Sequence, residues 1–413
     1  MIETTVSEAP QSWRLYRDNM LVRMHILFLM VSFFAAFQPA EAQTACAPTS
    51  KLYCLVQNQL GTESNEFNAL NEAVGTVVSD LPLASPASGV IYSVDPQLKL
   101  SVPSDMTFGP ILTQRPETVG RHKAYVSLVY QYFRFSEVDG TDLKTLPSVT
   151  KTSDLAFVTI NNLDLFVHQF SGYFTFGLTN RIDISAAVPI LDVHESFTSA
   201  GSKIILSGTS TPSTPINISN SGSATGFGDV VLAAKGTIWK PEKGGLAAGL
   251  EVRVPTGDAE NFLGSGTVGV KPYVSAAYGR RLSIHGNFGY QVNGNTKLVT
   301  NSTGGQGQLP NRMFESVGID WGARKWITLV ADILAERVFE AHRIEIGTAA
   351  VNEDNFQTIV APSPVNSYNR TDGAFGAKVK YGSFIATGNV LVKLDQGGLR
   401  ARVVPLGGIS YTF

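Results

Sequence analysis

Charged side chains recur at every second position in several apolar segments of the C-terminal two-thirds of the chain. In Leu246–Val254 the apolar positions alternate with Glu251 and Arg253, and in Val317–Trp321 they alternate with Asp320. Alternate positions of a strand point to opposite faces, so each segment predicts one face without charge and one with charges of both signs. Such a charged face can line a water-filled conduit or form ion pairs across strands.

The same parity defines a larger set of predicted lumen-lining residues. The set is Glu251, Arg253, Lys271, His285, Asp320, Asp332, Glu336, Lys378, Lys380, Arg400 and Arg402, with Asp229, Lys235 and Lys393 as further inward charges. Two interpretations remain open. The charges define the field that a solute meets in a conduit, or they form an ion-pair network that stiffens a plugged barrel.

Enzymatic chemistry has little support in the sequence, which lacks a glycine-rich phosphate loop, a paired-histidine metal motif and a Gly-x-Ser-x-Gly elbow. His285 falls on the charged face, whereas the active groups of a lipid-acting barrel must meet lipid. His168 could face lipid near the outer end of its strand, beside Gln169 and Ser171, because the alternation over Leu163–Phe176 slips phase and predicts a bulge. We therefore expect no catalytic, cofactor or metal site.

Composition excludes two common classes of protein. Charged residues make up 16% of the 413 residues, against about 25% in a soluble globular chain, which is too little for a water-facing surface. After the N-terminal region, no apolar run approaches the ~20 residues that a membrane-spanning helix needs. The net charge of -2 gives no electrostatic basis for binding nucleic acid. A closed β-barrel is the remaining way to span a membrane.

After Gly120 the chain divides into twelve segments with strand periodicity, joined by connections that are alternately short and long. The short connections are Leu178–Arg181, Pro241–Gly244, Gly279–Arg281, Ala323–Lys325 and Gly382–Ser383, and the long ones include Glu195–Ser223, Gly294–Asn311 and Glu340–Asp372. Outer-membrane barrels alternate tight periplasmic turns with longer external loops. The sequence therefore predicts an all-β fold, an antiparallel transmembrane β-barrel of about twelve strands, with both termini on the periplasmic side.

The N-terminal region predicts export to an envelope compartment. Residues 25–37 are apolar, follow Arg23 and precede the small-residue triplet at residues 40–42, which is the pattern of a signal peptide cleaved before Gln43. An anchor helix is the alternative, and the short apolar run disfavours it.

Three parts of the chain are predicted on this basis. They are a signal peptide at residues 1–42, an N-terminal periplasmic or plug segment at residues 43–120, and the barrel at residues 121–413. Residues 1–19 are polar, and Met20 or Met24 would be a more usual start. Within the plug segment, only Glu63–Ser79 has the periodicity of a helix.

The two cysteines, Cys46 and Cys54, follow the predicted cleavage site closely. An oxidising destination favours a disulfide that closes a short loop, stabilising it by about 2–3 kcal/mol. A lipid-modified Cys46 is the alternative, and Gln43 stands where a lipoprotein signal has leucine.

Several stretches resemble one family of barrels. They are Gly226–Lys240 (GFGDVVLAAKGTIWK), Gly245–Asp258 (GLAAGLEVRVPTGD), Gly266–Gly279 (GTVGVKPYVSAAYG), His285–Tyr290 (HGNFGY) and Tyr173–Ile190 (YFTFGLTNRIDISAAVPI). Together, over residues 120–413, they are similar to the transporters of the meta-pathway of phenol degradation family. The resemblance implies the outer membrane of a Gram-negative bacterium and passage of small, often aromatic or hydrophobic compounds.

The predicted function is a porin-like outer-membrane channel that takes up small hydrophobic or aromatic solutes. Its partners are the lipid bilayer, the barrel assembly machinery and the solute, and no nucleic acid. Two alternatives stay open: a non-conducting surface receptor or adhesin that uses the long connections, and a lipid-modifying barrel enzyme.

The chain end supplies one test of the outer-membrane prediction. Ile409, Tyr411 and Phe413 alternate, and a terminal Phe resembles the signal read by the barrel assembly machinery. Deleting Phe413 should lower the heat-modifiable folded band on gels and leave precursor in the periplasm. Normal assembly of the deletion would remove this argument.

Overall fold

The computed structural model describes residues 51–57, 65–85, 92–94, 101–103, 107–206, 212–301, 305–352 and 355–413. All of them belong to one unit, Gln43–Phe413. The predicted signal peptide and Cys46 lie outside the described residues. Cys54 is disulfide-bonded, and its pairing with Cys46 stays a prediction.

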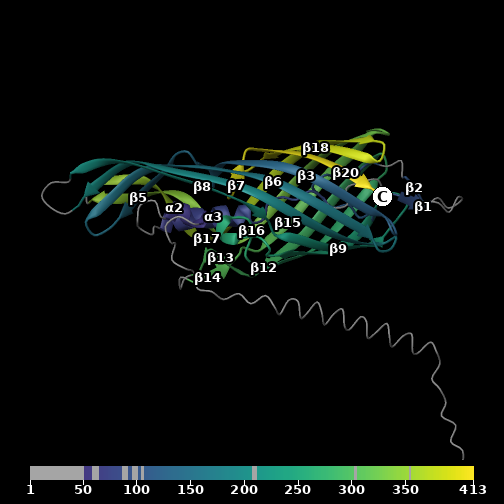
Figure 1. The fold of residues 1–413 in the computed structure, drawn as a ribbon, viewed down its shortest axis with the longest axis horizontal. Helices are drawn as coiled ribbons and strands as arrows, with labels where there is room; N and C mark the ends of the chain where they lie inside the picture. The colour runs from purple at the N-terminus through teal and green to yellow at the C-terminus, as the bar shows by residue number, and fades with distance from the viewer. Residues whose placement is uncertain are drawn as a thin grey trace, which may run out of the picture. The chain divides into compact units, whose positions relative to one another are not determined.

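Twelve antiparallel strands form a closed barrel, which confirms the predicted fold class (Figure 1). Around the wall they are β3 (Ala124–Val138), β6 (Leu155–Gly177), β7 (Ile182–Ile205), β9 (Val230–Trp239), β10 (Gly245–Val254), β11 (Gly269–Gly279), β12 (Leu282–Asn293), β15 (Arg312–Arg324), β16 (Ile327–Asn352), β17 (Asn355–Tyr381), β18 (Phe384–Lys393) and β20 (Val403–Thr412). The barrel closes where Leu406–Thr412 of β20 pair with Tyr125–Gln131 of β3. The amide of Phe413 continues this ladder by donating to the carbonyl of Ala124 at 2.8 Å.

The remaining elements extend the wall, lie inside it or form two small sheets of their own. They are α2 (Tyr53–Gln57), α3 (Asn65–Val78), β1 (Tyr92–Val94), β2 (Ser101–Pro103), β4 (Thr141–Asp142), β5 (Leu146–Lys151), β8 (Ser213–Phe227), the 3-10 helix η1 (Ala259–Asn261), β13 (Asn295–Thr300), β14 (Gln306–Gln308) and β19 (Leu399–Ala401). Among the described helices, none is long and apolar enough to cross a membrane.

The two ends of the barrel differ as the connection lengths predict. Short turns join β6 to β7, β9 to β10, β11 to β12, β15 to β16 and β17 to β18. At the other end, the prediction of loops at Glu195–Ser223 and Glu340–Asp372 is wrong. These residues continue as paired strands, with β7 on β8 to Ile204–Ser213 and β16 on β17 to Asn352–Asn355. Hydrogen bonds between paired strands satisfy the backbone N–H and C=O groups in water as they do in the membrane. Ser, Thr and Ile side chains are compatible with a strand in either environment.

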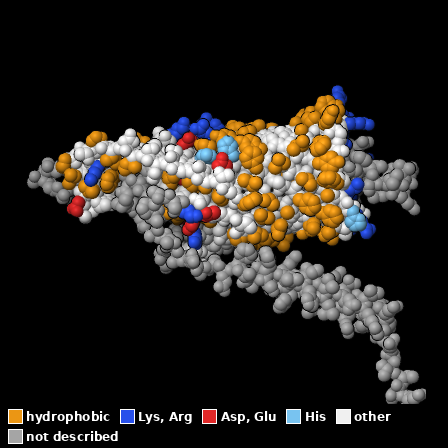
Figure 2. Space-filling view, viewed as in Figure 1, with side chains coloured by type: hydrophobic (Ala, Val, Ile, Leu, Met, Phe, Trp, Pro, Cys, Tyr) orange, Lys and Arg blue, Asp and Glu red, His pale blue; other side chains and the backbone are white. Residues whose placement is uncertain are grey.

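Apolar side chains cover the outside of the barrel. Leu250 and Ile319 are 44% and 46% exposed, whereas their chain neighbours Glu251 and Asp320 turn inward, with side chains 15% and 3% exposed. Figure 2 shows apolar side chains as a band across the visible face of the half of the barrel nearer the C-terminus, with Lys and Arg at its rim. Exposed aromatic residues lie beside the short turns, namely Trp239, Tyr278, Trp321, Trp326 and Tyr381. This band and its aromatic girdle are the features of an outer-membrane barrel.

Helices α2 and α3 fill the outer part of the lumen. Every side chain from Ala69 to Val78 is buried, so α3 is covered on all sides. Its apolar residues join one cluster with inward side chains of β3, β6 and β7, including Phe133, Leu163 and Phe197. The inner face of β6 is therefore apolar where it meets the helices and polar elsewhere.

The inward and outward assignment of adjacent residues gives a paired test. We expect Leu250→Lys to impair insertion, because a lipid-facing Lys near the midplane costs about 2–4 kcal/mol. Glu251→Gln, one residue on but facing the lumen, should assemble. The readout is the heat-modifiable band after refolding into vesicles. Equal behaviour of the two variants would show that the faces are assigned wrongly.

Candidate functional site

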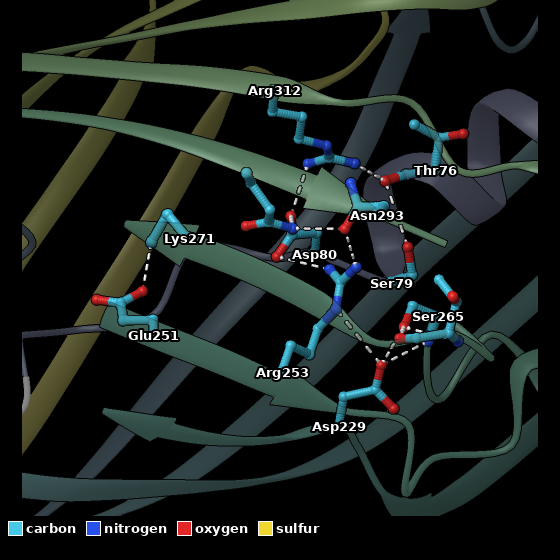
Figure 3. A network of polar contacts seen from close by, with 12 residues as sticks. Thr76, Ser79, Asp80, Asp229, Glu251, Arg253, Ser265, Lys271, Asn293 and Arg312 are labelled. Atoms are coloured by element: carbon cyan, nitrogen blue, oxygen red, sulfur yellow. Dashed lines mark hydrogen bonds and ion pairs between the residues drawn. The ribbon is translucent and has the colours of Figure 1, made fainter. Parts of the chain in front are cut away.

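The candidate site is the lumen, where charged side chains from the wall meet the N-terminal segment. On β10 and β11, Glu251 and Lys271 stand opposite each other in register and form an ion pair (Figure 3). The ammonium of Lys271 also lies 4.8 Å from the centre of the Phe314 ring on β15. Strand pairing thus places side chains from three strands on one patch of the wall.

Asp80, just after α3, is held between two arginines of the wall (Figure 3). Its carboxylate oxygens lie 3.1 Å from Nη1 of Arg253 and 3.2 Å from Nη1 of Arg312, and Gln291 donates to it at 3.0 Å. Burial alone would raise the pKa of Asp80, but the two guanidinium groups outweigh that effect and hold the pKa at about 2. Asp80 therefore carries a negative charge that lies between two buried cations.

Both arginines have further partners. Arg253 donates to the side chain of Asn293 at 2.7 Å, and Arg312 lies 2.9 Å from Glu336 and donates to the carbonyl of Thr76 at the end of α3. Arg312 thereby binds a helix carbonyl that has no partner within the helix. The end of α3 is thus fixed to β15.

Residues 107–119 are bound to the wall at the end of the barrel that carries the short turns. Lys378 and Lys235, on β17 and β9, each donate to two backbone carbonyls of this segment. The carbonyls are those of Phe108 at 3.1 Å and Pro110 at 2.5 Å for Lys378, and those of Arg115 at 2.9 Å and Glu117 at 2.8 Å for Lys235. Two buried lysine side chains thus satisfy four carbonyls of a segment without regular structure.

Amides of the same segment are bound from other strands. Phe108 donates to Thr328 at 3.1 Å, Gln114 to Asn287 at 2.5 Å and Val119 to Asp183 at 3.0 Å. Because the partners come from β16, β12 and β7, the segment is attached on several sides of the lumen.

His285 is a cross-link between strands. Its Nδ1 lies 3.0 Å from Asp320 on β15 and its Nε2 lies 2.6 Å from Asp332 on β16, with the imidazole almost fully buried. Asp320 also accepts a hydrogen bond from Thr107. Both ring nitrogens are occupied, so the imidazole has no free nitrogen to act as a base.

His168 faces outward, but its surroundings differ from the prediction. Its Nδ1 lies 2.8 Å from the hydroxyl of Tyr130, while Gln169 and Ser171 turn inward and are buried. The predicted bulge is wrong, since β6 pairs with β3 and β7 in unbroken register. The sequence pattern was misleading because the inward residues of β6 change from apolar to polar where the plug helices end.

The predicted lumen residues differ in their surroundings. Glu251, Arg253, Lys271 and Glu336 line a cavity of about 240 Å³. His285, Asp320, Asp332, Lys378 and Arg400 are buried in polar contacts elsewhere in the lumen, where Arg400 binds Asp372 at 2.7 Å. Lys380 is half-buried.

Arg402 does not share the burial of Arg400. It is exposed at a bend between β19 and β20, and its place in the lumen stays a prediction. The difference from Arg400 coincides with a break in the ladder: the pairing register of β19 with β3 shifts between Arg400 and Ala401.

Several residues of the site were not predicted. Arg312 and Phe314 share the inward parity of Asp320 on β15, and extending that alternation toward the N-terminus would have found them. Asp80 has no such signal, because it follows a helix and acts through contacts distant in sequence. Among the described residues, no group of three or more His, Cys, Asp and Glu side chains is placed to hold a metal ion.

The fold and its apolar band define the class: this is a transmembrane β-barrel of the bacterial outer membrane. The model of the family described as putative MetA-pathway of phenol degradation matches residues 152–308, from β6 to β14. Within that stretch Asp258, the last residue of the Pro-Thr-Gly-Asp sequence, caps η1 and accepts a hydrogen bond from Lys51 at 2.7 Å.

Several solved structures are similar to this chain at low sequence identity. An outer membrane channel from Pseudomonas putida F1 is 13% identical over 72% of this chain and 97% of its own, with a TM-score of 0.45. A Pseudomonas aeruginosa FadL homologue is 12% identical over 79% and 96%, with a TM-score of 0.34. The P. putida toluene transporter TodX is 11% identical over 70% and 89%, with a TM-score of 0.33. No curated protein matches the sequence.

Removing the carboxylate of Asp80 should loosen the end of α3. In Asp80→Asn, Arg253 and Arg312 lose a charged partner, which should cost about 3 kcal/mol, the lower end for buried pairs, since Asp80 keeps some solvent access. Amides of residues 76–85 should then exchange hydrogen about 100-fold faster. Asp164→Asn, which removes the exposed partner of Arg134, is the control.

The same interaction has a defined pH dependence. The folded-state pKa of Asp80 lies below its unfolded value, so its contribution is complete above about pH 4 and is lost as the pH falls through about 2. The difference in exchange between wild type and Asp80→Asn should therefore shrink below pH 4. A difference that stays constant down to pH 2 would contradict the charge interaction.

Proposed function

We propose that this barrel is an outer-membrane channel for small hydrophobic or aromatic solutes, and that its N-terminal segment is a plug. The observation that carries the proposal is the cavity of about 240 Å³ inside the lumen. Residues 80–84 and 112–114 of the N-terminal segment form part of its lining. The cavity therefore lies on the path that a solute through the barrel must take.

The dimensions of the barrel support a narrow channel. Twelve strands enclose a bore between that of eight-stranded barrels, which side chains fill, and that of open sixteen-stranded porins. Helix α3 and residues 107–119 occupy much of this bore. Passage then requires residues 107–119 to move. The hydrogen bonds from Lys235 and Lys378 to the carbonyls of this segment hold it in the closed position.

The lining of the cavity supports the solute class. Tyr173, Tyr273, Leu112 and Leu334 provide apolar surface beside the charged groups. The family description that matches residues 152–308 names phenol degradation, which also fits aromatic solutes.

A surface receptor or adhesin is the second candidate. The β7–β8 and β16–β17 hairpins continue well beyond the apolar band, and Ile346 and Phe356 are 56% and 64% exposed there. Exposed apolar side chains on an extension in water can bind a partner.

The test combines conductance and uptake. In planar bilayers, Lys378→Met should raise single-channel conductance severalfold over wild type, because two carbonyls of residues 107–119 lose their donor. Lys144→Met, an exposed lysine near β4, should not. Cells that lack their major porins should take up labelled benzyl alcohol faster when they express the wild-type barrel.

Absence of conductance in the Lys378 variant, together with uptake equal to that of cells without the barrel, would contradict the channel. The surface receptor would then be the better account.

A further inference from the structure

The end of the barrel that carries the short turns is strongly basic, and Figure 2 shows Lys and Arg side chains at this rim. Exposed cations occur in or beside four of the five short turns and in residues 120–123, just before β3. They are Arg121, Arg181, Lys240, Lys243, Arg280, Arg281, Arg324 and Lys325, which we call the basic rim. The same turns and residues 120–123 contain a single acidic residue, Glu242. This end of the barrel therefore carries a large excess of positive charge.

Most cations of the basic rim have no carboxylate beside them. Arg280 pairs with Glu242, and no other member of the basic rim forms an ion pair with a described residue. Toward the other end of the barrel, an exposed cation can have such a partner, since Arg134 lies 3.3 Å from Asp164. A set of exposed cations without counter-charges attracts anions from its surroundings.

The basic rim lies at the edge of the apolar band. Trp239 directly precedes Lys240, and Trp326 directly follows Lys325, with the two tryptophans 64% and 54% exposed. Exposed tryptophans of membrane proteins lie at the level of the lipid headgroups. Long basic side chains lay their apolar stems along such a surface and extend their charge to the same level. The short turns of an outer-membrane barrel face the periplasm, so the headgroups are those of the periplasmic leaflet.

The distribution of the cations indicates what kind of partner they meet. They begin at Arg121, before β3, and continue to the turn between β15 and β16, so they span nine of the twelve strands around the wall. A folded protein would contact one continuous patch, whereas lipid surrounds the barrel. Charge spread around the circumference at headgroup level therefore favours a lipid partner.

We propose that the basic rim binds anionic phospholipids, with phosphatidylglycerol as the representative, in the leaflet that faces the periplasm. The lipid phosphate accepts hydrogen bonds from the ammonium and guanidinium groups, while the neighbouring tryptophans contact the lipid below the phosphate. Phosphatidylcholine binds less well, because its own quaternary ammonium group compensates the phosphate charge. This interaction surface is independent of the solute that the lumen passes.

The chain contains its own probes for this site. Trp239, Trp321 and Trp326 all lie beside the short turns, and the fourth tryptophan, Trp13, is outside the described residues and is replaced by Phe. The full-length barrel is refolded into vesicles of phosphatidylcholine with brominated acyl chains, which quench tryptophan fluorescence. Unbrominated phosphatidylglycerol is then mixed in, and the recovery of fluorescence gives its binding constant relative to phosphatidylcholine.

We expect a preference of about fivefold for phosphatidylglycerol at 0.1 M salt, the effect of about one basic residue at a membrane surface. The preference should fall below twofold at 1 M salt, because the charges are exposed and are screened. This salt dependence is measured on the wild-type charges and needs no further substitution.

A combined variant tests which residues carry the preference. Lys240→Gln, Lys243→Gln, Arg324→Gln and Lys325→Gln together should reduce it below twofold. The charge-retaining combination Lys240→Arg, Lys243→Arg, Arg324→Lys and Lys325→Arg should keep it. The matched control is Lys144→Gln with Lys151→Gln, two exposed lysines near β4 and β5, which should also keep it. The heat-modifiable band confirms that each variant is folded.

Three results would overturn the lipid site. They are equal binding of the two lipids at 0.1 M salt, a preference that 1 M salt leaves unchanged, and a full preference in the folded variant with four Gln substitutions. After the first of these results, a soluble acidic partner would be the better occupant of the basic rim.

Discussion

Hydrocarbon offers no partner to a charge or to an unpaired backbone group, and this constraint determines the remaining structure. The ladder has to close, as it does between β20 and β3. Charged side chains have to take the inward parity, where they meet one another at close range. Glu251 with Lys271 and His285 with Asp320 and Asp332 are direct consequences.

Four basic side chains of the inner wall take partners from the N-terminal segment. Asp80 lies between Arg253 and Arg312, and the carbonyls of residues 107–119 accept hydrogen bonds from Lys378 and Lys235. The same contacts that satisfy the wall also narrow the bore.

The periodicity of the sequence was sufficient to predict the strands of the wall but not the segments that lie inside the lumen. Alternation in segments such as Leu246–Val254 predicted the barrel, its strand number and the inward parity of Glu251, because strand geometry is local. Asp80 and residues 107–119 have no period, and their partners lie up to 270 residues away. The bulge expected near His168 failed for a related reason, because the apolar inner face of β6 reflects contact with α3, which no local pattern reports.

Native-state hydrogen exchange of residues 107–119 in the intact barrel, reconstituted in lipid, tests most directly whether this segment is part of the lumen. The structure predicts strong protection of the amides of Phe108, Gln114 and Val119, which donate to Thr328, Asn287 and Asp183. It also predicts faster exchange at Phe108 in Lys378→Met, whose segment loses two anchored carbonyls. Exchange of these three amides at the rate of an unstructured peptide in the wild-type barrel would contradict the plugged lumen.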